Sequence, residues 1–163
     1  MAASVYLFEG RLSEAMYRFK YAGKTSLSKP LGDLLTDHHI VTPKYDAIVP
    51  VPLHISKLRE RGFNQSQMLA VGPGKKLRKK PDPFMIERTR PTPPQAGMNR
   101  KERIKNIRGA FKVREGVNVK GKRFLLIDDV FTTGATTSEC SKVLKKAGAE
   151  IVNVLTLARV VAG

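Results

Sequence analysis

Two adjacent carboxylates stand directly after a short apolar run in the last third of this sequence. Asp128 and Asp129 follow Phe124–Ile127, and a run of small and hydroxyl-bearing residues, 132–137, comes soon after them. Neighbouring carboxylates repel each other, so the pair is costly unless it faces a cation or hydroxyl groups. The hydroxyls of a sugar would meet that requirement, because each can donate a hydrogen bond to a carboxylate.

The segment 132–137 has the composition of a phosphate-binding loop. Gly134 can adopt a positive φ, so successive backbone N–H groups can point into one concavity, and the Thr hydroxyls add donors. The helix expected to begin here adds the partial positive charge of its N-terminus. Neither GxxxxGK[ST] nor GxGxxG occurs in the chain. An ordinary helix cap after an acidic turn is the structural alternative, but the order of strand, acidic pair, hydroxyl-rich loop and helix favours a monophosphate site.

The pattern of apolar residues predicts the elements that position this segment. Strands alternate with helices, which is typical of a parallel α/β sheet that binds ligands at the carboxyl ends of its strands. We expect the basic stretch 71–83 to be a connector and the Pro- and Arg-rich stretch 87–108 to be a long functional loop. The expected helices are 9–22, 27–35, 56–71 and 136–147, and the expected strands are 45–51, 84–86, 124–127 and 151–157.

The composition indicates one soluble globular domain. The chain has 163 residues, of which 41% are hydrophobic and 27% charged, and it lacks the run of about 18 apolar residues that a membrane span needs. The N-terminus has no basic region followed by an apolar core, so we expect a cytoplasmic protein without membrane insertion. Cys140 is the only cysteine, which excludes an internal disulfide and argues against a structural zinc site.

The positive charge is concentrated in the middle of the chain. The net charge is +16, and residues 54–123 hold 20 of the 30 basic residues but only 5 of the 14 acidic ones. Such a field attracts polyanions, which include nucleic acid, phosphorylated metabolites and anionic lipid. A solvated, self-repelling loop region is the alternative.

The stretch IDDVFTTGATT, residues 127–137, resembles the phosphoribosyl pyrophosphate (PRPP) motif of type I phosphoribosyltransferases. The resemblance implies a catalytic acidic pair, Asp128 and Asp129, that binds the ribose hydroxyls, with Asp129 near the developing oxocarbenium charge. It also implies Mg²⁺, carried by the diphosphate of PRPP and without direct protein ligands. The PRPP-binding residues implied in this way are Asp128, Asp129, Val130, Thr132, Thr133, Gly134, Ala135, Thr136 and Thr137.

Further blocks of sequence are similar to the competence protein F (ComF) family, phosphoribosyltransferase-like proteins associated with DNA uptake in bacterial transformation. The blocks are residues 6–23, 49–70, 88–111 and 154–159. The resemblance implies a type I phosphoribosyltransferase fold: a parallel central sheet flanked by helices, with a flexible loop and a small N-terminal hood. We expect the hood at 1–40 and the core at 41–163, within one compact domain. Many members carry a zinc ribbon before this part, whereas this chain has none, so we expect no zinc.

The fold implied by the resemblance places a pyrophosphate-binding loop after the strand at 45–51. Its candidates are Pro52, Leu53, His54, Arg59 and Arg61, because guanidinium groups bind diphosphates directionally. For the two arginines the alternative is an exposed position on a helix. For His54 it is a structural position in a loop.

The stretch 88–108 would correspond to the loop that closes over substrate and excludes water. Arg103 and Asn106 are three residues apart, so they would share a face of a helix. The alternative role is contact with nucleic-acid phosphates, which would be salt-sensitive and weakly sequence-selective because aromatic residues are sparse here. The candidates are Arg88, Arg90, Gln95, Arg100, Arg103 and Asn106.

Three functions follow from these patterns. The first is a ComF-like protein that binds PRPP with Mg²⁺, serves DNA uptake, and uses a basic surface for single-stranded DNA and possible partners in the DNA-uptake machinery. The second is a metabolic phosphoribosyltransferase with a nucleobase or amine acceptor. The third is a non-catalytic protein that binds PRPP or DNA. As an enzyme it would be a glycosyltransferase of unknown acceptor.

Overall fold

A four-stranded parallel sheet forms the centre of the computed structural model, which describes residues 1–42, 44–93 and 97–160. The strand order is β1 (Ala2–Leu7), β6 (Ile151–Arg159), β5 (Arg123–Phe131) and β2 (Ala47–Pro50). This arrangement confirms the predicted parallel α/β sheet. The other elements are α1 (Gly10–Tyr21), a 3₁₀ turn (Thr25–Leu27), α2 (Ser28–Thr36), α3 (Ile55–Arg61), α4 (Gln65–Leu69), α5 (Val71–Leu77), β3 (Ile86–Arg88), α6 (Arg100–Ile107), β4 (Phe111–Val113) and α7 (Ala135–Lys146).

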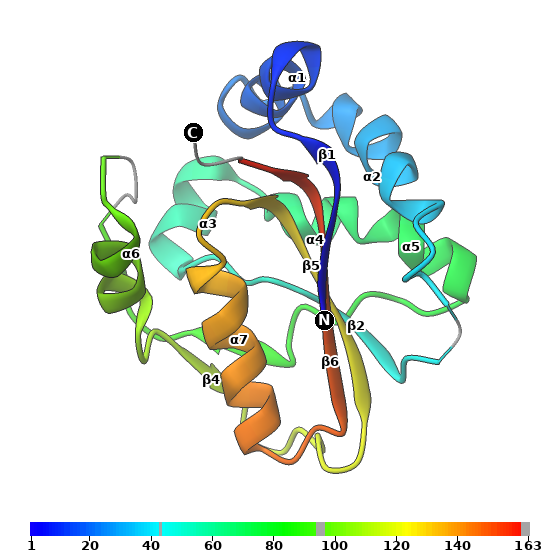
Figure 1. Ribbon diagram of the computed structural model, residues 1–163, viewed down its shortest axis with the longest axis vertical. Helices are drawn as coiled ribbons and strands as arrows, with labels where there is room; N and C mark the ends of the chain where they lie inside the picture. The colour runs from blue at the N-terminus through cyan, green and yellow to red at the C-terminus, as the bar shows by residue number, and fades with distance from the viewer. Residues whose placement is uncertain (43, 94–96, 161–163) are drawn as a thin grey trace.

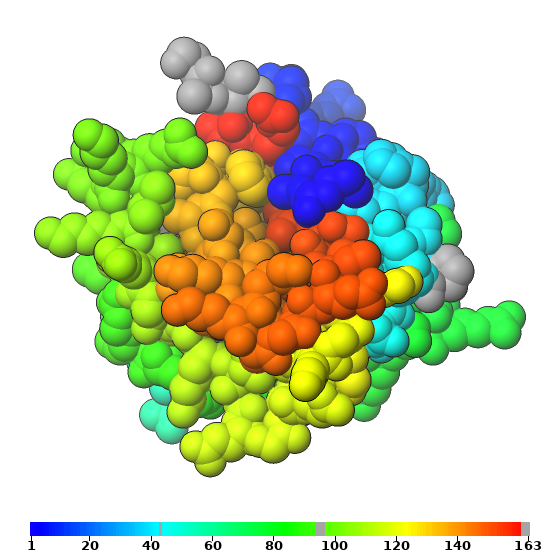
Figure 2. All heavy atoms as spheres, turned by 60° about the horizontal axis from the view of Figure 1, so that its bottom comes forward, coloured from blue at the N-terminus to red at the C-terminus, as the bar shows by residue number. Residues whose placement is uncertain are grey.

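Helices cover the sheet on both faces (Figure 1). Along β5, Leu125 and Ile127 pack with residues of α1, α2 and α4. On the other face, Phe124 and Leu126 pack with α7 and the paired strands β3 and β4. The alternation follows from the two-residue period of a strand, and burial on both sides explains why the run is continuously apolar. Figure 2 shows the face on which α7 (orange) lies between the region of α6 (green) and the N-terminal segment (blue).

The strand β5 continues through the acidic pair. Asp128 pairs with Thr156 of β6, and Val130 pairs with Ala158. The strand predicted at 124–127 is therefore too short, because β6 also runs on to Arg159 and continues to supply backbone partners. The strand extends to Phe131 and holds both aspartates in a fixed register.

The predicted helix 56–71 and the connector after it differ from the structure in one respect each. A break at Gly62, which has φ 81°, divides the helix into α3 and α4, and the Asn64 side chain caps α4. The connector is not wholly a loop, because Val71–Leu77 forms α5 with Pro73 in its first turn. Gly72 packs so closely on α2 that an added Cβ would lie 2.4 Å from the Gly32 carbonyl oxygen. Gly72, which lies in the predicted connector, is thus the position at which α5 packs closely on α2.

Four further elements, β1, β3, β4 and α6, depart from the sequence prediction. β1 was not predicted, because it is a partly exposed edge strand whose pairing with β6 is long-range. The expected strand 84–86 is shifted to β3, which pairs with β4 in a separate antiparallel sheet. The expected loop 87–108 contains α6, which begins with a capping box formed by Asn99 and Glu102. The predicted helices near α1, α2 and α7 are confirmed, as are strands at β2 and β6.

Candidate functional site

A cavity of about 480 Å³ opens at the carboxyl ends of β5 and β2. It brings together the acidic pair, two residues of the threonine loop (residues 132–137), the segment after β2 and two residues at the end of α1. This is the edge of the sheet at which parallel α/β folds bind ligands. The lining residues are Phe8, Lys20, Tyr21, Val51, Pro52, Leu53, Gln65, Arg88, Arg103, Asp128, Asp129, Val130, Thr132, Thr136 and Val160.

The two carboxylates are buried and held by named partners. Asp128 Oδ1 accepts hydrogen bonds from Ser66 Oγ and from the Asp129 amide, both at 2.9 Å. Asp129 Oδ1 accepts one from the Val130 amide at 2.7 Å, and Asp129 Oδ2 forms an ion pair with Lys20 Nζ. Sequence reasoning required a cation or hydroxyls at this pair but missed Lys20. The residue lies on α1 beside the buried Phe19, and its sequence position gives no sign that it reaches β5.

The acidic pair has an unusual charge balance. Burial, followed by the negative charge of Asp129, raises the pKa of Asp128 to about 7. For Lys20, burial alone would lower the pKa, but the charge and the hydrogen bond of Asp129 outweigh it and the pKa is raised. Asp128 is therefore a carboxyl group that titrates near neutral pH, while Asp129 forms the ion pair with Lys20. Such a pair can accept hydrogen bonds from two sugar hydroxyls once Asp128 is ionised.

The loop at residues 132–137 turns at Gly134. Gly134 has φ 73° and stands immediately before α7, and an added Cβ would lie 2.5 Å from the Phe131 ring. The first turn of α7 holds no acidic residue, so nothing in it opposes an anion at the helix N-terminus. Thr137 Oγ1 donates to the Gly134 carbonyl, and the buried Thr133 Oγ1 has no hydrogen-bond partner among the described residues.

The pyrophosphate-loop candidates separate into two groups. Pro52 and Leu53 line the cavity, whereas His54 caps α3 by accepting from the Ser56 amide at 3.3 Å. Arg61 donates to Gln65 Oε1 at 2.6 Å and lies over the Tyr21 ring, so it faces a neighbouring hollow. Arg59 is exposed on α3 and is not part of the cavity lining.

The arginines of the predicted functional loop also differ from one another. Arg88 lines the cavity and lies over the Phe111 ring, its Nε is buried without a partner among the described residues, and burial lowers its pKa. Arg90 donates to the Asn106 and Arg108 carbonyls at 2.8 Å each, so it ties the segment to itself.

Helix α6 carries three of the remaining candidates. Arg103 lines the cavity and donates from Nε to the Met98 carbonyl at 2.9 Å, whereas Arg100 faces a second hollow beside it. Asn106 donates from Nδ2 to the Pro93 carbonyl at 3.0 Å, which is a structural contact. Gln95 lies outside the described residues.

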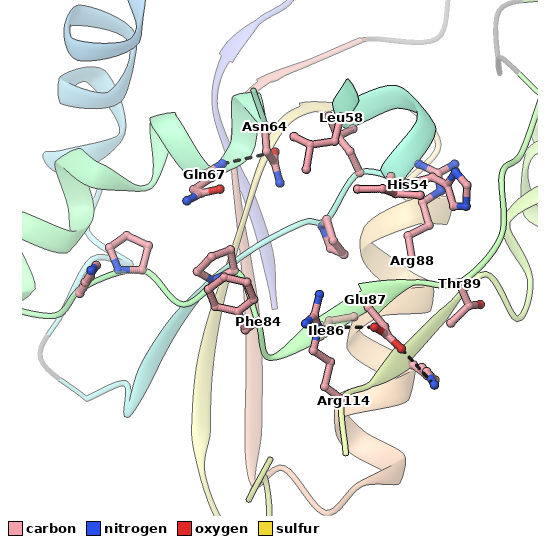
Figure 3. Close-up of a pocket in the computed structure, with 17 residues that line it drawn as sticks. His54, Leu58, Asn64, Gln67, Phe84, Ile86, Glu87, Arg88, Thr89 and Arg114 are labelled. Carbon is pink, nitrogen blue, oxygen red and sulfur yellow. Dashed lines mark hydrogen bonds and ion pairs between the residues drawn. The ribbon is translucent and has the colours of Figure 1, made fainter. Parts of the chain in front are cut away.

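A larger groove of about 700 Å³ adjoins the cavity and shares Pro52, Leu53 and Arg88 with it. Figure 3 shows His54 and Arg88 at one end of this groove. The exposed ring of Phe84 lies farther along, with the Arg114 guanidinium 5.2 Å from its centre. Glu87 forms ion pairs with Lys112 and Arg114 at 3.0 and 3.5 Å, so part of the positive charge of these two side chains is already neutralised.

Within residues 1–42, 44–93 and 97–160, no group of three or more His, Cys, Asp or Glu side chains is placed to hold a metal ion. In the same part of the chain, no helix has the length and apolar character that crossing a membrane requires.

Comparison with known proteins finds relatives over most of the chain, although no protein-family profile matches it. Competence protein F of Haemophilus influenzae is 33% identical over 157 residues, which cover 91% of this chain and 68% of the relative. The DNA utilization protein YhgH of Escherichia coli K12 is 30% identical over 154 residues, covering 91% and 67%. Competence protein ComFC of Streptococcus pneumoniae is 29% identical over 156 residues, covering 96% and 67%.

Solved structures identify the fold. The glutamine PRPP amidotransferase of B. subtilis, complexed with ADP and GMP, aligns with a TM-score of 0.52 at 26% identity. A structure described as the allosteric regulatory enzyme of purine biosynthesis aligns at 0.51 and 25%. Each alignment covers 81% of this chain, which spans only about a quarter of the amidotransferase length. The likeness, together with the parallel sheet, confirms the type I phosphoribosyltransferase fold.

Proposed function

The chain belongs to the competence protein F family, and on that premise we propose that it binds the ribose 5-phosphate part of PRPP and serves DNA uptake. One observation carries the proposal. A buried carboxylate pair on β5 and two threonines that follow it, Thr132 and Thr136, line a single cavity. The relatives named for competence and for DNA utilization support the biological role.

The ribose and its phosphate would bind through different groups. Asp129, which pairs with Lys20, accepts from one ribose hydroxyl, while Asp128 accepts from the other once it has lost its proton. The 5′-phosphate accepts from backbone N–H groups of 132–137 and from Thr hydroxyls. Thr132 lines the cavity beside the acidic pair, and the absence of an acidic residue from the first turn of α7 supports an anion there.

The diphosphate arm would extend toward Pro52, Leu53 and Arg88. The buried Nε of Arg88 needs an acceptor, and a guanidinium can bind a diphosphate through parallel hydrogen bonds. The described residues offer no cluster of carboxylates for a metal, so Mg²⁺ would arrive on the diphosphate, whose charge it neutralises. If the protein is an enzyme, the acceptor would displace pyrophosphate at C1 of the ribose, and Asp129 would stabilise the positive charge that develops there.

Calorimetric titration of PRPP with Mg²⁺ tests the proposal. The wild-type chain is expected to bind, and Asp128→Asn/Asp129→Asn is expected to lose at least tenfold in affinity, because both acceptors for ribose hydroxyls are weakened. Asp33→Asn is a matched control, since Asp33 is an exposed carboxylate that pairs with Lys29 and lies outside the cavity lining. If the wild-type chain does not bind PRPP, the proposal fails. Pyrophosphate release in the presence of a nucleobase panel would add a transferase activity.

A further inference from the structure

The cavity of about 480 Å³ that Asp128 and Asp129 line is called the ribose cavity, and residues 132–137 are called the phosphate loop. A second cavity, of about 570 Å³, adjoins the ribose cavity at the phosphate loop. It shares Arg103, Thr132 and Val160 with that cavity. Three segments meet around it: the start of α6, the end of β5 with its loop, and the end of β6. We name it the arginine cavity after Arg100, Arg103 and Arg159. Its other lining residues are Met98, Phe131, Thr132, Thr133 and Val160.

The arginine cavity has an uncompensated positive charge. Three guanidinium groups line it, and none of its described lining residues is acidic. Arg100, Arg103 and Arg159 form no ion pair with a described carboxylate, in contrast to Arg18, Arg114 and Arg123. Like charges around one hollow repel each other, so the arrangement favours an anion between them.

Two further features suit a phosphate group. Arg103 is fixed by its hydrogen bond to the Met98 carbonyl, which presents its guanidinium in a set orientation. Thr133, whose buried hydroxyl lacks a partner among the described residues, lines this cavity and not the ribose cavity. Guanidinium forks bind phosphate oxygens through paired hydrogen bonds, which lysines cannot do.

We propose that the arginine cavity is a second phosphate site that takes a backbone phosphate of single-stranded DNA. The inference rests on the proposed function. A polymer is favoured over a free anion because Arg100 and Arg159 are exposed, so that a chain can pass across them. Phe131 is the one aromatic residue in the described lining, so the cavity contacts the backbone and leaves the bases unread. The relatives named for DNA utilization give the polymer its identity.

The shared residues couple the two cavities. A sugar phosphate in the ribose cavity and a DNA phosphate in the arginine cavity would both draw on Arg103 and Thr132, and their negative charges would repel each other across this boundary. Ribose 5-phosphate should therefore weaken DNA binding, and DNA should weaken ribose 5-phosphate binding by the same factor. The protein would release one ligand as it takes up the other.

Fluorescence anisotropy with a labelled dT20 oligonucleotide tests the site. Arg100→Gln/Arg159→Gln should lose about tenfold or more in affinity, and the slope of log K against log salt should become shallower by about 0.7, because one phosphate contact is lost. Lys101→Gln/Lys105→Gln is the matched control, because it removes the same charge from exposed positions of α6 outside the cavity lining. Equal losses in the two variants would mean that only net charge matters and would overturn the site.

A second measurement separates this proposal from the first. The dT20 affinity is measured with and without saturating ribose 5-phosphate, and a several-fold weakening is expected. If both ligands bind the wild-type chain independently, the coupling is refuted while the sugar-phosphate site stands. If the chain binds PRPP but not dT20, the arginine cavity is not a DNA site. If it binds dT20 but not PRPP, the proposed function fails. The arginine cavity then stands only if the arginine double variant loses more dT20 affinity than the lysine double variant.

Discussion

At the scale of single residues, the buried contact between Lys20 and Asp129 determines the charge of the ribose cavity. The ammonium comes from α1 and the carboxylate from β5, two segments more than a hundred residues apart in the sequence. A buried ion pair is costly to break from one side, because the remaining charge has no partner. Lys20 therefore ties the N-terminal helix to the site as well as balancing the acidic pair.

Replacing Lys20 with methionine should lower the free energy of unfolding by about 3–5 kcal/mol, because Asp129 is left buried and unpaired. Urea unfolding followed by circular dichroism measures the change. Lys29→Met is the control, since the Lys29–Asp33 pair is exposed and should contribute less than about 1 kcal/mol. The double variant Lys20→Met/Asp129→Asn should recover most of the loss, and no recovery would contradict a charge effect.

The raised pKa of Asp128 predicts a dependence on pH. Because the folded protein holds this proton more tightly than the unfolded chain does, the stability that it contributes is complete below pH 3.8 and is lost as the pH rises through about 7. Ribose 5-phosphate affinity should change in the opposite direction and rise between pH 6 and 8, since ionised Asp128 is the better acceptor. Calorimetry over that range measures the rise. Asp128→Asn reports the titration of the ligand phosphate alone, and an identical profile in both proteins would refute the assignment.

At the scale of elements, the turn between β5 and α7 depends on one position that tolerates only glycine. Gly134 combines a positive φ with a close contact to the Phe131 ring, so a side chain there meets both strain and a clash. The conformation of this turn determines where α7 begins and which N–H groups face the ligand. The geometry of the phosphate loop therefore depends on a contact within the loop itself.

Gly134→Ala should abolish measurable PRPP binding and destabilise the fold by about 2 kcal/mol or more, because the loop must move away from Phe131. Titration calorimetry and thermal unfolding measure the two effects. Gly116→Ala separates strain from clash, because Gly116 has φ 77° but no atom within 4 Å of an added Cβ. That control should lose stability while keeping PRPP affinity. Equal binding by both variants would argue against a role for the loop conformation.

The sequence predicted the elements whose causes are local and missed those whose causes are distant. The strand at Phe124–Ile127, the acidic pair and Gly134 are close together in the chain, so their spacing predicted a buried strand that carries the carboxylates toward a turn and a helix. Helix α5 was missed because Gly72 is explained only by its contact with Gly32. Lys20 was missed for the same reason, since nothing near it in the chain indicates a carboxylate on β5. The roles of Arg90 and Asn106 as internal ties also depend on folded neighbours.

At the scale of the whole molecule, the excess charge lies in the middle of the chain and reaches the cavities through Arg88, Arg100 and Arg103. The flanking parts are nearly neutral and supply most of the sheet, including both aspartates and Lys20. The fold thus places a nearly neutral scaffold beside a strongly basic segment. Their boundary is where the ligand cavities occur.

This distribution predicts that single-stranded DNA binding is strongly dependent on salt. Between about 50 and 200 mM salt, dT20 affinity should fall roughly 10- to 100-fold, because each phosphate contact releases bound counterions. Anisotropy titrations across this range measure the slope. Ribose 5-phosphate, with a single phosphate, should show a much shallower dependence under the same conditions. A flat response for dT20 would mean that the basic segment does not contact DNA.

The two edges of the central sheet differ in how readily each could pair with a strand of another molecule. At β2, the Asp82 amide already donates to the Ile48 carbonyl at 2.9 Å, and Pro50 has no N–H to offer, so another strand cannot easily add there. At the other edge, β1 is the last strand that the described residues form, and it exposes Tyr6 and Leu7. Self-association through strand addition would therefore start at β1. Lysines introduced into that strand are the natural means to keep concentrated preparations monomeric.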